Sequence, residues 1–340
     1  MSEPSTMPSP MEIIQLGTAF CDAKAVLAGT EFGLFTVLDD GPASGERIRE
    51  RLGLNGRGLR DWLNVLVSLG LLRRDGDHYA NTPAAERYLV RGKPTYVGGF
   101  LERANHKLYP AWGNLAEALR TGEPQVAGRD GDIFDHMSQQ PAELKKFLAM
   151  MDAVNNLLGP KLVEAFDWSA GRTVVDVGGA RGNLLATVCK SQPHLSGTVF
   201  DLPQVQAPFE EHMAQLGMSE RIGFHAGDFF TDELPEADIL IIGHVLHDWS
   251  DEERRMLIGK AYRAVRPGGA LLIYDAMLDD ELTHKVNLLI SLDMLLITHG
   301  GAEYTVQECR TWLAEAGFGD VTCDPLGETE TLVVARKQAA

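Results

Sequence analysis

The stretch TVVDVGGARGNLLATVCK, residues 173–190, decides the fold. Its apolar run leads through Gly178, Gly179 and Gly182 into a segment that favours a helix. A strand, a glycine-rich turn and a helix in this order are typical of the first unit of a doubly wound α/β sheet, whose ligand lies at the carboxyl ends of the strands. The turn departs from the G-x-G-x-x-G spacing of dinucleotide-binding proteins, because Ala180 stands at its third position.

Short apolar runs alternate with helical segments from this turn to the end of the chain. The runs are GTVFDLP from 197, IGFHAGD from 222, ADILIIGHVLH from 237, GALLIYDAML from 269, and then DVTCDPLG and TETLVVARK. Strands separated by helices of about ten or more residues predict a parallel sheet. We therefore expect residues 167–340 to form an α/β domain with a doubly wound, mostly parallel sheet.

Acidic residues recur at the expected strand ends. Asp201 ends the second strand, as Asp176 ends the first, and a carboxylate at that place can bind a ribose diol. Asp228 and Phe229 follow the third strand, where the acid can accept the adenine amino group and the ring can cover the base. A helix cap beside a core phenylalanine is the alternative for this pair. Its register with the two earlier acids favours a ligand, and together these residues predict an adenosine ligand without a pyrophosphate.

A histidine-rich segment, HVLHDWSDEE at 244–253, follows the fourth strand. Asp275 ends the fifth strand and Glu303 lies in a later glycine-rich turn, so both acids can converge on the same pocket. A carboxylate beside an imidazole orients the ring and raises its pKa. We expect no metal here, because the H-x-x-H spacing on a strand-to-loop segment does not place His244 and His247 on one face.

The N-terminal half has a different pattern. Apolar residues recur at helical spacing, and the segments in chain order are helices within 11–38, 44–52 and 57–72 and a hairpin within 73–82. Two helices followed by a hairpin form the outline of a winged helix. We expect a winged-helix-like dimerisation domain at 11–95, with the first helices as its interface, and a helical linker at 96–166 that contributes to the acceptor pocket.

Composition limits the classes of function. Of 340 residues, 31 are Lys or Arg and 48 are Asp or Glu, so the net charge is −17. That charge repels nucleic acid, which argues against the DNA-binding alternative for the winged helix. No apolar run approaches the roughly 18 residues of a membrane span. The N-terminus lacks a basic segment followed by an apolar one, so we expect a cytoplasmic protein. The four scattered cysteines indicate neither a disulfide framework nor a zinc site.

Taken together, the motifs DVGGARG, FDLP, GDFF, HVLHDWSDEE, LLIYDAML and GGAEYT resemble those of the S-adenosyl-L-methionine-dependent small-molecule O-methyltransferases. These are the dimeric plant caffeic-acid and isoflavone type and the bacterial enzymes that tailor polyketides and phenazines. The resemblance extends from about Gln15 to Lys337. It implies a Rossmann-like class I methyltransferase domain with a seven-stranded sheet, S-adenosyl-L-methionine as cofactor, S-adenosyl-L-homocysteine as product, a small aromatic acceptor, a homodimer and no metal.

The resemblance also implies roles for particular residues. His247 is then the general base, and Asp275 and Glu303 hold its ring. The implied cofactor-binding residues are Gly178, Gly179, Gly182, Asp201, Leu202, Asp228, Phe229 and Asn155. The implied acceptor-binding residues are Phe147, Met151, Met294 and Asp248.

The chain departs from the family pattern at four places. One is the segment Asp293 to Gly301, which is shorter than in the plant enzymes and leaves the role of Met294 open. The common GGGTG is GGARG here, and we interpret Ala180 as small enough to be tolerated. Asp275 stands where many relatives have Glu, so we expect a looser contact with His247. Gly243 replaces a lysine of the plant pattern, so a cofactor contact there must come from the backbone or be absent. The alternative functions are C-methylation or chemistry without methyl transfer in the same family, and a winged-helix regulator that senses a small molecule.

Overall fold

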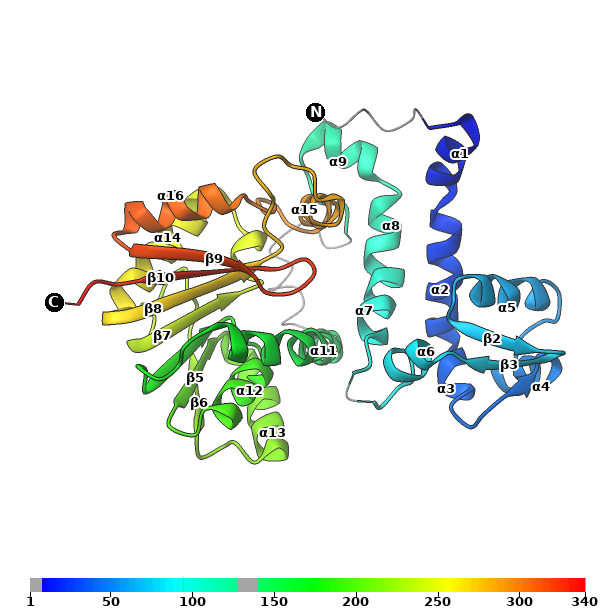
Figure 1. The fold of residues 1–340 in the computed structure, drawn as a ribbon, viewed down its shortest axis with the longest axis horizontal. Coiled ribbons are helices and arrows are strands. Elements are labelled where there is room, and N and C mark those ends of the chain that lie inside the picture. The colour runs from blue at the N-terminus through cyan, green and yellow to red at the C-terminus, as the bar shows by residue number, and fades with distance from the viewer. Residues whose placement is uncertain (1–7, 94, 127–139, 340) are drawn as a thin grey trace. The chain divides into compact units, whose positions relative to one another are not determined.

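The computed structural model describes residues 8–93, 95–126 and 140–339, and the chain divides into two compact units, Met1–Lys107 and Leu108–Ala340. Each unit has its own hydrophobic core, and the two are described separately (Figure 1).

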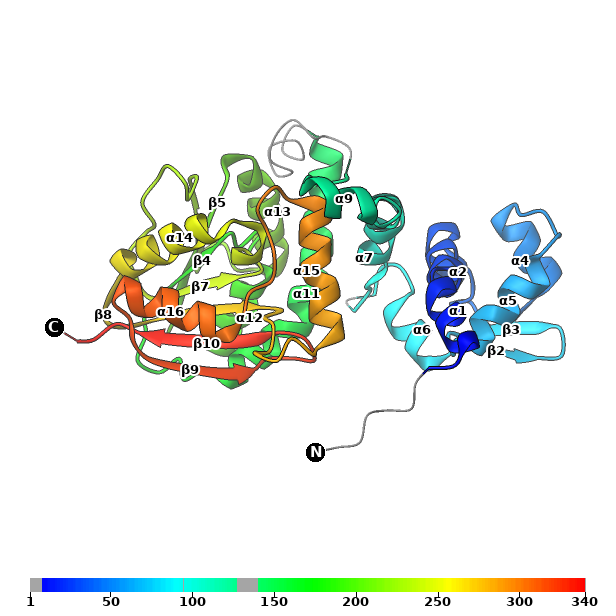
Figure 2. The ribbon, with the colours of Figure 1, turned by 90° about the horizontal axis from the view of Figure 1, so that it is seen from above.

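The first unit combines helices with a small sheet, as the sequence predicts. Its helices are α1 (Pro10–Thr18), α2 (Phe20–Phe32), α3 (Leu34–Val37), α4 (Gly45–Leu52), α5 (Leu59–Ser68), α6 (Pro83–Tyr88) and α7 (Gly98–Arg103), followed by a π-helical turn, Ala104–Leu108. The strands β1 (Ala43–Ser44), β2 (Leu72–Asp75) and β3 (His78–Asn81) pair in the order β1-β3-β2. Helices α4 and α5 followed by the β2–β3 hairpin form the winged-helix outline (Figure 2).

Local chemistry explains where these elements end. The helix expected to reach residue 72 stops at Ser68, because Gly70 adopts a left-handed φ of 73° that breaks the helix. The two-residue connection of the hairpin contains Gly76, whose φ is 59°. The buried residues Phe35, Ile48, Leu63 and Leu66 form the centre of this core.

Helix α1 contrasts with that core, because none of its residues is buried. It begins at a capping box in which the Ser9 side chain and Glu12 satisfy each other's backbone N–H groups. Its large apolar side chains, and Phe20 just beyond it, are more than half exposed; they are Met11, Ile13, Ile14, Leu16 and Phe20.

The second unit is built on a sheet whose described part has seven strands in the order β6-β5-β4-β7-β8-β10-β9. The strands are β4 (Thr173–Val177), β5 (Ser196–Asp201), β6 (Ile222–Ala226), β7 (Ala237–Gly243), β8 (Val265–Asp275), β9 (Gly319–Pro325) and β10 (Thr331–Arg336). The first five pair in parallel, and β10 is antiparallel to both β8 and β9. The order reverses between β4 and β7, and doubly wound sheets bind their ligands at the carboxyl ends of the strands beside such a reversal. The predicted doubly wound, mostly parallel sheet is confirmed.

Helices cover both faces of this sheet (Figure 1). They are α11 (Pro141–Ala165), α12 (Asn183–Ser191), α13 (Gln206–Leu216), α14 (Asp251–Ala264) and α16 (Val306–Ala316). The second unit also contains the helices α8 (Tyr109–Trp112), α9 (Leu115–Thr121) and α15 (Lys285–Ile297), and the short 3-10 turns η2 (Pro203–Val205) and η3 (Leu246–Asp248). One core layer joins the sheet to α11, α12 and α13, and the other joins it to α14 and α16. Within the described residues, no helix is long and apolar enough to cross a membrane.

Gly243 has a structural explanation. It pairs with Tyr274 on the neighbouring strand, and a Cβ atom at position 243 would overlap the phenol ring of Tyr274. Tyr274 is buried in the core layer on the side of α11 and α12. The lysine of the plant pattern would therefore have to displace this ring, which accounts for the glycine.

Candidate active site

The turn after β4 approaches its surroundings too closely for side chains at its glycines. Gly178, Ala180 and Gly182 all have left-handed φ angles, of 69°, 51° and 79°. A Cβ on Gly178 would lie 2.8 Å from Val245, and one on Gly179 would lie 2.7 Å from the Asp176 carboxyl. The bare backbone of this turn is thus a cradle that a ligand can approach directly.

Asp201 is fixed beside that cradle. Its Oδ2 accepts a hydrogen bond from the Ala180 N–H at 2.8 Å, and its Oδ1 accepts one from the Leu202 N–H at 2.7 Å. Burial raises the pKa of Asp201 to about 6 although both N–H groups act to lower it. Burial, together with the nearby Asp201, raises the pKa of Asp176 to about 8. Two partly desolvated acids therefore lie at the ends of β4 and β5, where donors from a ligand would stabilise them.

The turn after β6 holds Asp228 and Phe229. Asp228 Oδ1 accepts from the Phe230 N–H at 2.8 Å, so the carboxylate also caps its own turn. Phe229 packs edge-on against Phe230 and Trp249, with ring centroids 4.9 and 5.7 Å apart. The carboxylate therefore caps a turn and not a helix, so only the packed phenylalanine of the alternative is present, and the ligand role of this pair stays a prediction.

Lys260, which sequence reasoning missed, anchors the same turn. Its buried Nζ donates to the carbonyl oxygens of Phe229, Phe230 and Asp232 at 2.8, 3.1 and 2.8 Å. An ammonium group has three N–H donors, so all of them are satisfied by this one turn. A lysine in the middle of α14 carries no signal in the sequence that would distinguish it from a surface lysine.

His247 lies in a buried cluster of acids. Its Nδ1 is 2.7 Å from Glu303 Oε1 and 3.6 Å from Asp275 Oδ1, and its Nε2 is 3.9 Å from Asp248 Oδ1. Asp275 is hydrogen-bonded instead by the Tyr304 hydroxyl, at 2.5 Å from Oδ2. Glu303 is therefore the partner that orients the ring, and Asp275 contacts it more loosely.

The charges of this cluster act on one another. Burial alone would lower the pKa of His247, but Asp275, Asp248 and Glu303 raise it to about 10. Burial raises the pKa of Asp275, and His247 opposes that rise. Burial, aided by His247, lowers the pKa of His244 to about 3. Between the two histidines, only His247 is placed to exchange a proton in the neutral range or above.

His244 and His247 lie close together, so the prediction that their spacing keeps them off one face is wrong. His244 has a left-handed φ of 53°, which turns the chain so that the two rings lie 5.7 Å apart. Within the described residues, His244, His247 and Asp275 each offer an atom within 4.8 Å of the others, a spacing that could hold a metal ion. One ring nitrogen of His247 is already bonded to Glu303, and we assign no metal to this cluster.

The remaining predicted residues lie on two helices. Asn155 is buried on α11, which also carries the half-buried Phe147 and Met151. Phe147 packs on a small cluster that includes Ala180 of the turn after β4. Met294 is buried on α15. Their roles toward an acceptor stay predictions.

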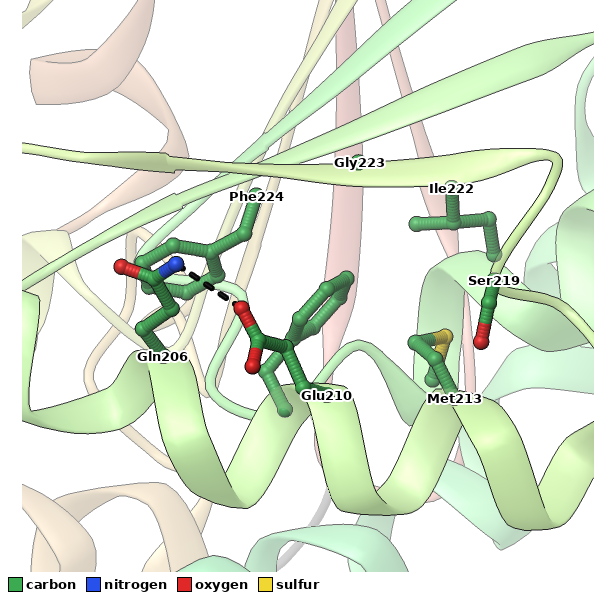
Figure 3. A pocket seen from close by; sticks show the side chains of 8 residues that line it. Gln206, Glu210, Met213, Ser219, Ile222, Gly223 and Phe224 are labelled. Atoms are coloured by element: carbon green, nitrogen blue, oxygen red, sulfur yellow. Dashed lines mark hydrogen bonds between the residues drawn. The ribbon is translucent and has the colours of Figure 1, made fainter.

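A separate pocket lies between α13 and the edge strand β6 (Figure 3). None of its lining residues is among the predicted site residues; they are Gln206, Phe209, Glu210, Met213, Ser219, Ile222, Gly223 and Phe224. Two of them pack directly on the cradle, because a Cβ on Gly182 would lie 3.0 Å from Phe209 and 3.2 Å from Met213.

A doubly wound sheet with a glycine cradle after its first strand and acids after the next two has the architecture of the class I S-adenosyl-L-methionine-dependent methyltransferases, to which its structural neighbours belong. The chain belongs to the O-methyltransferase family: the model of its O-methyltransferase domain matches residues 112–319, and that of the O-methyltransferase dimerisation domain matches residues 14–91. Its cofactor is accordingly S-adenosyl-L-methionine.

Individual relatives agree with this assignment. The chain is 46% identical to TcmO, the tetracenomycin polyketide synthesis 8-O-methyl transferase of Streptomyces glaucescens, over 96% of this chain and 97% of that protein. It is 38% identical to the N,N-dimethyltransferase OxyT of Streptomyces rimosus, over 90% of each. Human N-acetylserotonin methyltransferase in complex with its cofactor superposes with a TM-score of 0.89 at 30% identity, covering 99% of this chain and all of that one.

The anchoring of the turn after β6 can be tested by Lys260→Met. The substitution leaves three carbonyl groups without their donor, and we expect the Kd for S-adenosyl-L-homocysteine to rise about tenfold, equivalent to about 1.4 kcal/mol. Calorimetric titration measures it. Lys337→Met is the matched control, because Lys337 Nζ also binds two carbonyls, those of Tyr262 and Val265 at the C-terminal end of α14, and makes no contact with the turn after β6. Equal loss of affinity in both variants would contradict the prediction.

Proposed function

We propose that this enzyme transfers a methyl group to a phenolic hydroxyl of a small aromatic natural product, with His247 as general base. The observation that carries the base assignment is the 2.7 Å contact between His247 Nδ1 and Glu303. It holds the ring so that Nε2 is left to accept a proton. The relationship to TcmO supports an aromatic polyketide-like acceptor.

The cradle fits the cofactor. S-adenosyl-L-methionine supplies an electrophilic methyl group on a sulfonium centre. Gly178, Gly179 and Gly182 expose backbone to its methionine and ribose side, and Asp201, already oriented by two N–H groups, binds the ribose hydroxyls together with the backbone at Leu202. Asp228 and Phe229 bind the adenine, and the buried Asn155 on α11 contacts the methionine part.

The base is needed because a phenol with a pKa near 10 is poorly ionised at neutral pH. His247 Nε2 removes the hydroxyl proton, while Glu303 accepts the Nδ1 hydrogen bond and stabilises the charged ring. Asp275, held by Tyr304, adds a second negative charge behind the ring. Phe147, Met151 and Met294 form apolar walls for a flat acceptor, and Asp248 borders it beside Nε2.

The proposal is tested by incubating the enzyme with labelled cofactor and a panel of phenols. Transfer of label to oxygen is expected in the wild type. His247→Asn should lower kcat by about 10²- to 10⁴-fold while the Kd for S-adenosyl-L-homocysteine changes little, because His247 makes none of the proposed cofactor contacts. Near wild-type turnover in this variant, with cofactor binding intact, would disprove the role of His247.

The same assay addresses a second candidate. The relationship to OxyT favours an amine acceptor as the alternative, and label on nitrogen would establish it. Label on carbon, or conversion of an acceptor without S-adenosyl-L-homocysteine formed in step, would establish the other chemistries that the family resemblance allows.

The pH dependence follows from the acid cluster. His247 must be neutral to accept a proton, and its pKa of about 10 means that it is mostly protonated in the free enzyme at pH 7. We expect kcat/KM to rise with pH from 7 towards 10. Glu303→Gln removes one negative charge, which should lower the pKa of His247 and move the rise in kcat/KM to lower pH. Acceptors with different hydroxyl pKa values are the control. The assignment is contradicted if the rise in kcat/KM shifts with the pKa of the acceptor, or if it does not shift in Glu303→Gln.

We also propose a homodimer formed through the exposed apolar side chains of α1 and the start of α2. The dimerisation-domain match over residues 14–91 supports it. Leu16→Asp and Ile13→Asp together should convert the dimer to a monomer in sedimentation equilibrium, whereas Gln15→Asp on the same exposed helix should not. A monomeric wild type would contradict the proposal. A cytoplasmic location and the lack of a nucleic-acid partner stay predictions.

A further inference from the structure

An ion pair joins the cofactor cradle to helix α11. Arg181, between Gly179 and Gly182, donates from Nε to Asp152 Oδ2 at 2.6 Å, and its Nη2 contacts the same oxygen. The side chains of Arg181 and Asp152 are only 20% and 10% exposed. We propose that Arg181 is a positioning residue that, through Asp152, sets the place of the cradle relative to the ligand-binding face of α11.

The pair sits in a wider polar network. Asn183 Nδ2, in the first turn of α12, donates to the Asp152 carbonyl at 3.3 Å and to Asn156 Oδ1 at 2.9 Å. From α13, His212 Nε2 lies 3.1 Å from Asn183 Oδ1 and 3.5 Å from Asp152 Oδ2. Three helices thus converge on Asp152. Its Oδ1 is buried and has no hydrogen-bond partner among the described residues.

That geometry makes the arginine the main counter-charge of Asp152. Burial raises the pKa of Asp152, and Arg181 is the first of the groups that oppose this rise, ahead of His212. Burial lowers the pKa of His212, so this ring is a weak source of positive charge. Removing the guanidinium would leave a desolvated carboxylate with one unpaired oxygen already, so the surrounding helices would have to shift.

The position of the pair connects it to both ligands of the proposed reaction. Asp152 follows Met151, a proposed wall of the acceptor pocket, and precedes by one helical turn Asn155, proposed to contact the cofactor. Arg181 lies within the cradle itself and stands where the common family sequence GGGTG has threonine. A threonine is too short to reach α11 and carries no charge, so the ion pair between the cradle and Asp152 depends on the arginine.

The inference rests on the proposed cofactor roles and is tested by a double-mutant cycle. The variants are Arg181→Met, Asp152→Asn and the double variant, with Arg181→Lys to keep the charge and remove the fork. Kd for S-adenosyl-L-homocysteine is measured by calorimetry, KM and kcat by label transfer, and Tm by thermal unfolding. Lys146→Gln, which breaks an exposed ion pair to Glu143 on the same helix, is the matched control.

We expect each single variant to raise the Kd and the cofactor KM about tenfold, the double variant to be no worse than the poorer single one, and Arg181→Lys to recover part of the loss. A structural role alone would lower the active fraction, and hence the apparent kcat, without moving KM. A Kd and KM within twofold of wild type in Arg181→Met and Asp152→Asn, even with a lower Tm, would overturn the inference. A wild type that binds no S-adenosyl-L-homocysteine would instead overturn the cofactor assignment and this inference with it.

Discussion

The left-handed turn after β4 is the constraint on which the rest of the site depends. Because Gly178, Ala180 and Gly182 adopt positive φ angles, the chain reverses within a few residues and leaves bare backbone at the point where the strand order switches. Val245, Asp176 and the ring of Phe209 press against that backbone so closely that larger residues would clash. Packing therefore holds the backbone of the cradle in place, and a preorganised site lowers the entropy cost of binding.

A second set of contacts holds His247 and the acids around it in place, because Asp248, Asp275 and Glu303 would otherwise repel one another. Arg254 donates from Nε to the Leu246 carbonyl at 2.9 Å and from Nη2 to the Ala302 carbonyl, so it ties together the segments that carry His247 and Glu303. The Ala302 N–H also donates to the His247 carbonyl at 2.9 Å. These contacts fix the 2.7 Å bond to Nδ1 and with it the direction of Nε2.

The predictable part of the site consists of residues with local signals. Asp201, Asp228 and His247 each follow an apolar run that ends in a polar residue, and parallel strands bring such ends to one edge. Lys260, Arg254 and the Arg181–Asp152 pair lack such a signal, since each acts by reaching a carbonyl or carboxylate far away in the chain. The short distance between His244 and His247 could not be predicted, because nothing in the sequence indicates that a histidine adopts a left-handed φ.

The alternation of apolar runs, glycines and helical segments was enough to predict the doubly wound sheet and the winged helices, because strand and helix periodicity are local properties. Which carboxylate orients His247 was decided only by packing: Glu303 lies 56 positions away in the chain and bonds the ring, whereas Asp275 is drawn to Tyr304. Gly243 likewise makes sense only once Tyr274 fills the space beside it. Contacts between distant segments depend on how side chains fill one shared volume, and that volume exists only in the folded chain.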